Sequence, residues 1–488
     1  MNILDVISIE QLEQDPGNTL LKKLKSLKKE EFLPDDRIVF SCYSDIDTNT
    51  LYHIEWCCYY IDIPFFFVTC NTDRPAVKDF FKNLDDSIEI INEKSLHPLL
   101  RETGHTPVFY NQNLCTHPWT GVHIWPDGGA SICCEAGSRL GEYNVKNDSL
   151  DDIFNSKEMA EIRNTFRQGK TPDQCMSCVN KEQQGQQSKR RLVQHKHKNI
   201  IHKVAFESEG ELFFIGGHLG NVCNAKCRIC SSFYSSSIAA EDIKFGTADE
   251  KQQAVNYLKE NVWKNFNFWE LLKGHDSLCN FEFLGGETFL QQRNLEYLQW
   301  LVDTNKSEHC MFEIVTNGST IPDSIKNYSD KFENLSITVS IDNIHERFEL
   351  ERSGVKWADL DKNLDVFCGL PKCSVGVNVT VSVMNVYYLP EIIEWLKTKR
   401  ISYYHVSILT YPDHLSINKL PHEYKNAIIE KLEKYNCNDI DHVLNAVRKS
   451  KDTDGADFTQ YMKFKDGIRQ ENFANTHPEV SMYYYKDV

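Results

Sequence analysis

Three cysteines near the middle of the chain have a spacing that suits metal binding. Cys223, Cys227 and Cys230 form a C-x3-C-x2-C pattern in a loop-like stretch. A structural zinc site closes its coordination with four ligands, whereas three thiolates on a four-iron cluster leave one iron open to a small molecule. The triplet therefore favours an iron–sulfur cluster with an exchangeable position. A zinc site, or a chance grouping among the 17 cysteines of the chain, is the alternative.

A Gly-Gly-Glu sequence further along the chain has the composition of a ligand-binding turn. Gly285, Gly286 and Glu287 follow a short apolar run at 281–284 that predicts a strand. Two glycines let the backbone approach a ligand closely, and a carboxylate accepts hydrogen bonds from an ammonium group. A turn at the start of a helix explains the glycines equally well in isolation, so the interpretation depends on the order and spacing of the two motifs.

Together, the two motifs resemble the signature of the radical S-adenosylmethionine (SAM) enzymes. The resemblance implies that the open iron chelates the amino and carboxylate groups of SAM, and that Glu287 holds the amino group. Two positions depart from the family pattern: Ile229, where relatives often have an aromatic residue, and Thr288, where they often have proline. Neither residue is a metal ligand, so the departures concern the adenine contact.

Strand-like runs alternate with helical patterns in the second half of the chain and predict six β-then-α repeats. The strands are expected at 212–215, 281–284, 312–316, 335–341, 374–383 and 404–409, and the helices at 290–304, 321–332, 358–367 and 389–399. We expect Gly216 and Gly217 to begin the loop after the first strand. This order predicts an α/β fold with a parallel, partial (β/α)6 barrel, in which ligands bind at the carboxyl ends of the strands.

Further polar residues fall at the same edge of the expected barrel. Asn317 follows the third strand, and Ser340 and Asp342 end the fourth. By resemblance to the family, Ser340 contacts the ribose of SAM and Arg352 contacts its carboxylate. A serine that faces the core and an arginine on the surface are the alternatives. The SAM-binding residues expected in this way are Gly285, Gly286, Glu287, Asn317, Ser340, Asp342 and Arg352.

A second set of cysteines begins with a predicted β-hairpin. After Cys115, the alternating runs 122–125 and 130–133 flank a Pro-Asp-Gly-Gly turn, and such a hairpin brings its two ends together. We therefore expect Cys133 to lie near Cys115. Consecutive side chains of a strand point to opposite faces, so the spacing assigns Cys133 as a ligand and Cys134 to packing. A bulge in the strand would reverse this assignment.

Cys175 and Cys178, after a helix expected at 150–168, complete a set of four ligands with Cys115 and Cys133. The arrangement resembles the SPASM/Twitch auxiliary-cluster domain of radical SAM enzymes. No further cysteine stands between Cys178 and the triplet, which is the Twitch pattern. A zinc ribbon is the alternative. In known members this domain usually follows the barrel, whereas here it precedes it.

Length and composition set the outer limits. A chain of 488 residues suggests two or three domains, and a net charge of −16 argues against a general nucleic-acid partner. The N-terminus lacks the pattern of a signal peptide and no run is long enough to span a membrane, so we expect a cytoplasmic protein.

The expected domains are a small α/β accessory domain at 1–105, the Twitch-type domain and linker at 106–198, the barrel at 199–420 and a helical extension at 421–488. In the first of these, strands are expected at 38–42 and 64–69 and helices at 18–30 and 75–84.

The sequence therefore predicts a radical SAM enzyme of the Twitch type. The resemblance implies two 4Fe–4S clusters, one that binds SAM and one auxiliary. It also implies reductive cleavage of SAM to a 5′-deoxyadenosyl radical, which abstracts hydrogen from a peptide or a small metabolite, and an electron donor such as a flavodoxin or ferredoxin. The alternative is a non-catalytic iron–sulfur or zinc scaffold, which needs neither an open iron nor Glu287.

Overall fold

The computed structural model describes residues 2–8, 36–42, 65–69, 114–167, 170–196, 210–260 and 268–485. The chain divides into two units. The first comprises Met1–Trp119, Glu161–Asp173 and Lys189–Gly210, and the second comprises Thr120–Ala160, Gln174–Ser188 and Glu211–Val488.

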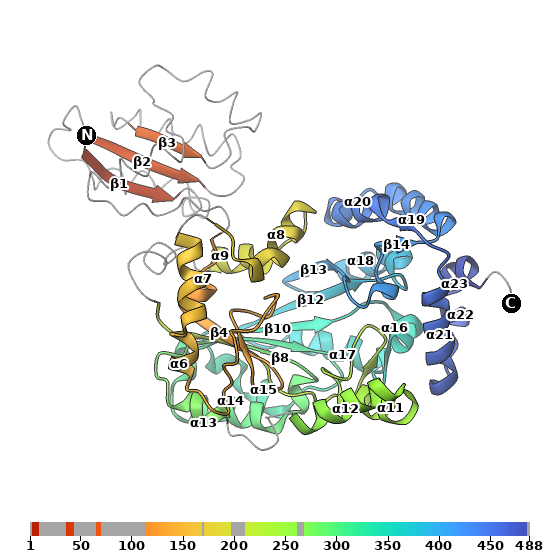
Figure 1. The fold of residues 1–488 in the computed structure, drawn as a ribbon, viewed down its shortest axis with the longest axis horizontal. Coiled ribbons are helices and arrows are strands. Elements are labelled where there is room, and N and C mark those ends of the chain that lie inside the picture. Colours follow the sequence, from red (N-terminus) through yellow and green to blue (C-terminus); the bar gives the residue numbers. More distant parts are fainter. Residues whose placement is uncertain are drawn as a thin grey trace. The chain divides into compact units, whose positions relative to one another are not determined.

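A small parallel sheet lies in the first unit. Its strands, in spatial order, are β1 (Asn2–Ser8), β2 (Asp36–Cys42) and β3 (Phe65–Thr69) (Figure 1). The strands expected at 38–42 and 64–69 are confirmed, and β1 is an additional strand. The helices expected at 18–30 and 75–84 lie outside the described residues.

One large sheet organises the second unit, with the order β13-β12-β10-β9-β8-β6-β4-β5. Every neighbouring pair is parallel except β4 with β5. The six predicted strands are present as β6 (Phe214–His218), β8 (Asn280–Leu284), β9 (Met311–Thr316), β10 (Asn334–Ser340), β12 (Cys373–Val381) and β13 (Tyr403–Ile408). The predicted α/β fold with a parallel sheet is therefore confirmed. Because the strands are parallel, their carboxyl ends meet at one edge, where the predicted site residues follow them.

The first of these strands differs from the prediction, because β6 includes Gly216 and Gly217. A Cβ atom on Gly216 would lie 2.6 Å from Nδ1 of His123, and one on Gly217 would lie 2.4 Å from a methyl carbon of Leu219. Neighbouring side chains thus occupy the space beside the strand, and only glycine fits there. The expectation of a loop was wrong, because these glycines serve close packing within a strand.

Helices connect the strands of the large sheet (Figure 1). The first crossover contains α11 (Ser236–Phe245), α12 (Ala248–Glu260) and α13 (Phe268–Lys273), and the later ones contain α14 (Gln292–Asp303), α15 (Asp323–Tyr328), α16 (His345–Glu351), α17 (Trp357–Cys368) and α18 (Leu389–Lys397). The four expected helices correspond to α14, α15, α17 and α18. In α18, Ile392, Ile393 and Leu396 form a buried apolar stripe, the pattern of a helix that packs on one face.

The predicted hairpin is also present. β4 (Gly121–Ile124) and β5 (Ala130–Ser131) pair in antiparallel fashion, and the amide of Trp125 donates to the carbonyl of Gly129 at 2.9 Å to close the turn. β4 also pairs in parallel with β6, so the hairpin extends the large sheet beyond the six predicted strands. The helices of this region are α5 (His117–Thr120), α6 (Leu150–Phe154), α7 (Lys157–Arg167), α8 (Met176–Gln183) and α9 (Lys189–Lys196).

The single helix expected at 150–168 is divided into α6 and α7. Ser149 caps α6 by a reciprocal pair of hydrogen bonds with Asp152, and the helix ends at Phe154, with Asn155 as its C-cap. The hydroxyl of Ser156 then accepts from the amide of Met159 at 3.2 Å and starts the second helix. A Ser residue inside a helical pattern can therefore act as a new cap, which the apolar periodicity alone does not reveal.

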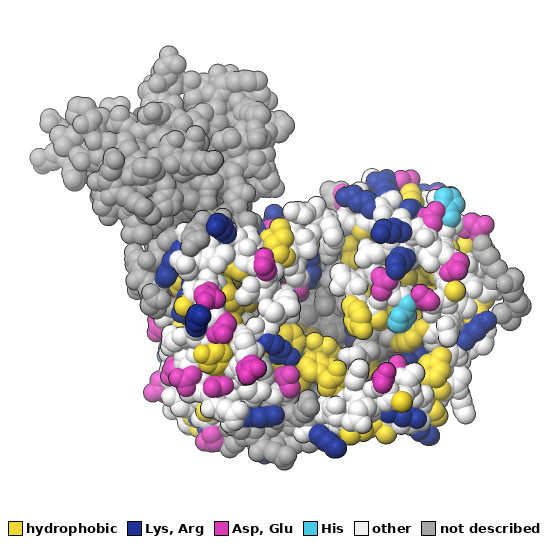
Figure 2. Space-filling model, viewed as in Figure 1, with side chains coloured by type: hydrophobic (Ala, Val, Ile, Leu, Met, Phe, Trp, Pro, Cys, Tyr) yellow, Lys and Arg dark blue, Asp and Glu magenta, His cyan; other side chains and the backbone are white. Residues whose placement is uncertain are grey.

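The C-terminal region is helical, as predicted. It contains α19 (His422–Tyr435), α20 (Asp441–Lys449), α21 (Ala456–Arg469), α22 (Phe473–Thr476) and α23 (Pro478–Tyr484), with a short parallel pair β14 (Lys419–Leu420) and β15 (Lys451–Asp452). Acidic and basic side chains are interspersed over the face of the second unit shown in Figure 2. No helix within the described ranges is both long and apolar enough to cross a membrane.

Candidate metal and cofactor site

The cysteine triplet lies on the loop that follows β6. Cys223, Cys227 and Cys230 are each half-buried, and burial raises the pKa of Cys223 to about 11 and that of Cys230 to about 12. The amide of Ala225 donates to Sγ of Cys223 at 3.4 Å. A thiol in a buried environment ionises only when a positive charge lies nearby, and a metal centre supplies that charge. The chemistry of these donors therefore fits a bound iron–sulfur cluster.

A short antiparallel pair of strands connects the cysteine loop with a later segment of the chain. β7 (Lys226–Cys227) pairs with β11 (Arg352–Ser353), so that Arg352 stands opposite Cys227. The next residue, Gly354, has a φ of +102°, and a Cβ atom there would lie 2.5 Å from the carbonyl oxygen of Asn224. Glycine is therefore required where the second segment passes over the cysteine loop.

Arg352 is buried and connects the triplet with a carboxylate. Its Nη1 donates to Sγ of Cys227 at 3.6 Å, and its Nη2 lies 2.7 Å from Oδ2 of Asp342. The other carboxylate oxygen of Asp342 accepts from the amide of Thr380 at 2.9 Å. Burial raises the pKa of Asp342, and the charge of Arg352 opposes this shift. The structure thus brings Asp342 and Arg352 together beside the cysteines. Ser340, at the end of β10, is half-buried.

The two glycines of the Gly-Gly-Glu turn lie directly against the chain that leads into the triplet. Gly285 and Gly286 have φ angles of +86° and +49°. A Cβ atom on Gly285 would lie 2.9 Å from the carbonyl oxygen of Gly220, and one on Gly286 would lie 2.4 Å from that of Val222. The glycines are therefore needed for contact with the protein's own backbone, a role that the sequence pattern did not distinguish from contact with a ligand.

Glu287 is fully buried and links the ends of two strands. Its carboxylate accepts hydrogen bonds from the hydroxyl of Thr316 at 2.7 Å, the amide of Asn317 at 2.6 Å and the amide of Phe289 at 3.1 Å. Burial raises the pKa of Glu287, and these three donors oppose the shift. A carboxylate has about four acceptor positions, so one position of Glu287 can still accept a hydrogen bond from a further donor.

Asn317 connects this carboxylate with the cysteine loop. Its side-chain nitrogen donates to Oδ1 of Asn224 at 2.8 Å, between the first two cysteines of the triplet. The motifs that were separate in the sequence, namely the triplet, Gly-Gly-Glu and Asn317, therefore form one connected arrangement at the carboxyl edge of the sheet.

The sequence interpretation missed a second layer of contacts, made by helix α21 and by Glu471, which follows it. Arg228, inside the triplet, is fully buried, and its Nη2 lies 2.5 Å from Asp466 and 2.7 Å from Glu471. The hydroxyl of Tyr461 donates to the carbonyl of Arg228 at 2.6 Å, and Arg469 donates to the carbonyl of Lys226 at 2.9 Å. A charged residue between two cysteines of the triplet was the only sequence signal for this layer.

The second set of cysteines is distributed over both units. Cys115, in the first unit, is buried; in the second unit Cys133 and Cys178 are buried, whereas Cys134 and Cys175 are half-buried. The assignment of Cys133 rather than Cys134 as a ligand stays a prediction.

Within the second unit, the end of the hairpin is bound to the segment that carries Cys175 and Cys178. The amide of Gly137 donates to the carbonyl of Gln174 at 2.9 Å. Glu135 accepts from Ser177 at 3.0 Å and forms an ion pair with Lys181 at 2.6 Å. These contacts flank both pairs of cysteines and keep the two segments next to each other.

Across the described ranges, no three His, Cys, Asp or Glu side chains converge on a position where they could hold one metal ion. In a 4Fe–4S cluster each cysteine bonds to a different iron, so the sulfur atoms of its ligands stand around a cluster and need not converge on one ion.

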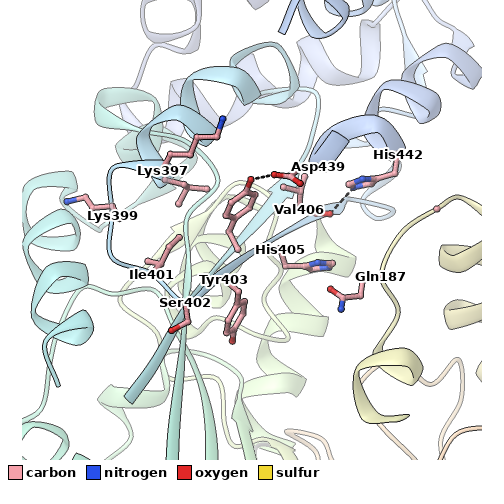
Figure 3. Close-up of a pocket in the computed structure, with 13 residues that line it drawn as sticks. Gln187, Lys397, Lys399, Ile401, Ser402, Tyr403, His405, Val406, Asp439 and His442 are labelled. Atoms are coloured by element: carbon pink, nitrogen blue, oxygen red, sulfur yellow. Dashed lines mark hydrogen bonds between the residues drawn. The ribbon is translucent and has the colours of Figure 1, made fainter. Parts of the chain in front are cut away.

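An open pocket of about 580 Å³ lies elsewhere, along the edge strand β13 (Figure 3). The hydroxyl of Tyr404 donates to Asp439, and His442 contacts the carbonyl oxygen of Val406 at 2.9 Å. Burial lowers the pKa of His405 and that of His442. The lining includes Lys399, Ile401 and Ser402, which precede the strand, and no residue of the cysteine loop, so the pocket is separate from that loop.

A family comparison identifies the segment that holds the second cysteine set. Residues 115–179 match the model of the SPASM family, an iron-sulfur cluster-binding domain. The match begins at Cys115 and includes Cys133, Cys175 and Cys178. The segment that the sequence predicted to hold an auxiliary cluster therefore matches an iron–sulfur cluster-binding domain family, and a parallel β/α sheet follows it.

Several solved structures share a partial likeness with the chain. The structure of native anSMEcpe with bound AdoMet is 17% identical, with 46% of this chain and 60% of that chain covered at a TM-score of 0.30. SuiB from Streptococcus suis, bound to S-adenosylmethionine, is 14% identical, with 57% of each chain covered at a TM-score of 0.29. The radical S-adenosylmethionine methyltransferase TsrM from Kitasatospora setae is 8% identical, with 84% of this chain and 73% of that chain covered at 0.27.

The matched part spans less than two thirds of the anSMEcpe and SuiB chains. At these TM-scores the likenesses do not define the activity of this chain. No curated protein matches it.

Proposed function

We propose that the protein is a radical SAM enzyme of the SPASM/Twitch type. The observation that carries the proposal is the loop after β6, where three cysteines without a fourth lie beside the Gly-Gly-Glu turn at the carboxyl edge of a parallel sheet. A closed structural metal site requires four ligands, whereas a four-iron cluster with one open iron requires three cysteines and a place for a small molecule beside them.

The residues of the chain would hold and tune the cofactors. Cys223, Cys227 and Cys230 would bind the first 4Fe–4S cluster, and Arg352 lies within hydrogen-bonding distance of one of the sulfur atoms. Hydrogen bonds to cluster sulfur are among the features that set a cluster's reduction potential. When bound, the cluster and SAM supply the electron and the 5′-deoxyadenosyl radical for hydrogen abstraction. Asp342 with Arg352, and Glu287 with Asn317, would supply the polar groups that contact the amino-acid part of SAM.

A second cluster would be held by Cys115, Cys133, Cys175 and Cys178, in the segment that matches the iron–sulfur domain family. An external donor such as a flavodoxin or ferredoxin would deliver electrons. The substrate would be a peptide or a small metabolite, and the expected cytoplasmic location stays a prediction. The competing function, a scaffold without catalysis, predicts the same second cluster but no cleavage of SAM.

The test is to reconstitute the protein with iron and sulfide without oxygen, reduce it with dithionite and add SAM. We expect about eight irons per chain, since two four-iron clusters are implied, and formation of 5′-deoxyadenosine detected by mass spectrometry. Tightly bound zinc in place of iron would contradict the proposal. Iron at this level without 5′-deoxyadenosine would favour the scaffold.

Glu287→Ala is expected to weaken SAM binding while both clusters remain. A buried ammonium that loses a charged partner costs about 1.5–3 kcal/mol, or roughly a ten- to hundredfold loss of affinity measured by calorimetry. The matched variant Glu287→Gln keeps an oxygen for the amide of Asn317 but removes the charge. A loss in both variants indicates a direct contact with SAM, and a loss in alanine alone indicates that Glu287 acts through Asn317. Unchanged affinity in the alanine variant would show that the turn has no part in SAM binding.

A further inference from the structure

A series of aromatic rings leads away from the cysteine triplet toward the hairpin. Tyr234 follows Cys230 in the same loop, and its ring centre is 5.1 Å from that of His218. His218, at the end of β6, stacks on Trp125 with ring centres 4.8 Å apart and planes 5° apart. The three rings come from three separate segments and form one continuous series of contacts, with Trp125 stacked on His218 and Tyr234 tilted by 44° against His218.

Hydrogen bonds continue this path to the second cysteine set. The indole nitrogen of Trp125 donates to the hydroxyl of Ser131 at 2.8 Å. That hydroxyl in turn donates to the main-chain carbonyl of Cys133 at 2.9 Å. Every contact from the loop of Cys230 to Cys133 is therefore a ring contact or a hydrogen bond, and all these residues belong to the second unit.

The rings are fixed in place from several sides. His123 contacts Nδ1 of His218 through its Nε2 at 2.8 Å, and the guanidinium of Arg139 lies 4.4 Å above the Trp125 ring. Burial lowers the pKa of His218 to about 4, so the ring is neutral at pH 7. Gly216 leaves the space that His123 fills. Because neighbouring side chains hold the three rings, the positions of the rings change little when the charge of a nearby cluster changes.

Tyr234 lies within electrostatic reach of both cysteine groups. Burial is the main cause that raises the pKa of Tyr234, and negative charge on Cys230 and on Cys134 acts in the same direction. Charges from both cysteine groups therefore act on the Tyr234 ring, whose contact with His218 is the geometric link toward the hairpin.

We propose that Tyr234, His218 and Trp125 form the route by which single electrons pass between the two iron–sulfur sites. The inference rests on the proposed function, which supplies the two clusters. In one transfer, the reduced auxiliary cluster loses one electron and the oxidised cluster at the triplet gains it. No bond forms or breaks and no proton moves, and an external one-electron reductant restores the auxiliary cluster. The rings act as a closely packed medium for the electron and are not themselves oxidised.

The experiment follows the electron directly and does not use turnover. The reconstituted protein is reduced by a light-activated flavin in the absence of SAM, so that no electron is consumed by cleavage, then frozen at successive times and examined by electron paramagnetic resonance. The signal of the auxiliary cluster is identified from the variant in which Cys223, Cys227 and Cys230 are replaced by alanine. We expect Trp125→Leu and Tyr234→Leu to slow the transfer between clusters several-fold, with iron content and both reduction potentials unchanged. Trp125→Phe, which keeps a ring, should retain most of the rate.

Phe233→Leu is the matched control, because Phe233 is adjacent to Tyr234 but its other ring contact is with Tyr257, outside the path. It should transfer electrons at the original rate. If a leucine variant loses a cluster, Ser131→Ala tests the same path by removing one hydroxyl, and a slower transfer is expected there too.

Two intact clusters with unchanged transfer rates in these variants would overturn the route and leave the proposed function standing. Absence of a second cluster from the unmodified protein would instead contradict the proposed function itself.

Discussion

Replacing Cys223, Cys227 and Cys230 together by alanine is expected to abolish the cleavage of SAM and to leave about half of the iron, because only the auxiliary set can still hold a cluster. The loss should be complete, since no other residue in the loop offers a thiolate. Iron analysis and the assay for 5′-deoxyadenosine measure the two effects on the same sample.

The matched control changes three other cysteines. Cys279, Cys368 and Cys373 are half-buried, like the triplet, but lie on other parts of the sheet and its helices. Their joint replacement by alanine should leave iron content and cleavage near the level of the unmodified protein. Equal losses in the two triple variants would mean that the triplet has no special role.

Arg228→Ala is expected to destabilise the cysteine loop strongly. The guanidinium is fully buried, and it bonds to Asp466, Glu471 and the carbonyl of Leu350. Removal of one partner from a buried ion pair typically costs about 3–5 kcal/mol, because the remaining charges are left uncompensated. We expect a lower denaturation midpoint of the iron-free protein and faster loss of iron to a chelator from the loaded one.

The control for this change is Arg448→Ala. Arg448 also forms an ion pair, with Glu433 at 2.6 Å, but both side chains are about half exposed. Exposed pairs contribute about 0–1 kcal/mol, so stability should hardly change. If the two arginine variants lose iron at the same rate, the contacts of α21 do not hold the loop.

The sequence predicted the parallel sheet and the hairpin because apolar runs and turn residues are local signals. The strands from β8 to β13 lie within a few residues of their expected positions. The predictions failed where the reason for a residue lies in a distant neighbour. Gly216 suggested a loop, but the space that it leaves is filled by His123 from the hairpin.

In the candidate site, too, some features were predictable from local sequence signals and others depended on distant neighbours. The order of the strands and motifs predicted Glu287, Asn317 and Asp342 at the edge that carries the cysteines, and the family resemblance added Arg352. The structure connects these four residues with the cysteine loop. The hydrogen bonds that Glu287 accepts from the chain itself were not predictable, since they depend on how the ends of β8 and β9 meet. The role of Arg228 was hidden for a similar reason, because both of its carboxylate partners lie near the C-terminus.

The distance along the sequence between Arg228 and its carboxylate partners also determines the order in which they are synthesised. Arg228 and Asp466 are 238 residues apart in the sequence. At a synthesis rate of about 5–20 residues per second, the cysteine loop leaves the ribosome roughly 10–50 s before its carboxylate partners. During that interval the triplet is present without the helix that encloses it. Stable insertion of iron into this loop is therefore expected to be a late event, which follows synthesis of α21 rather than synthesis of the cysteines.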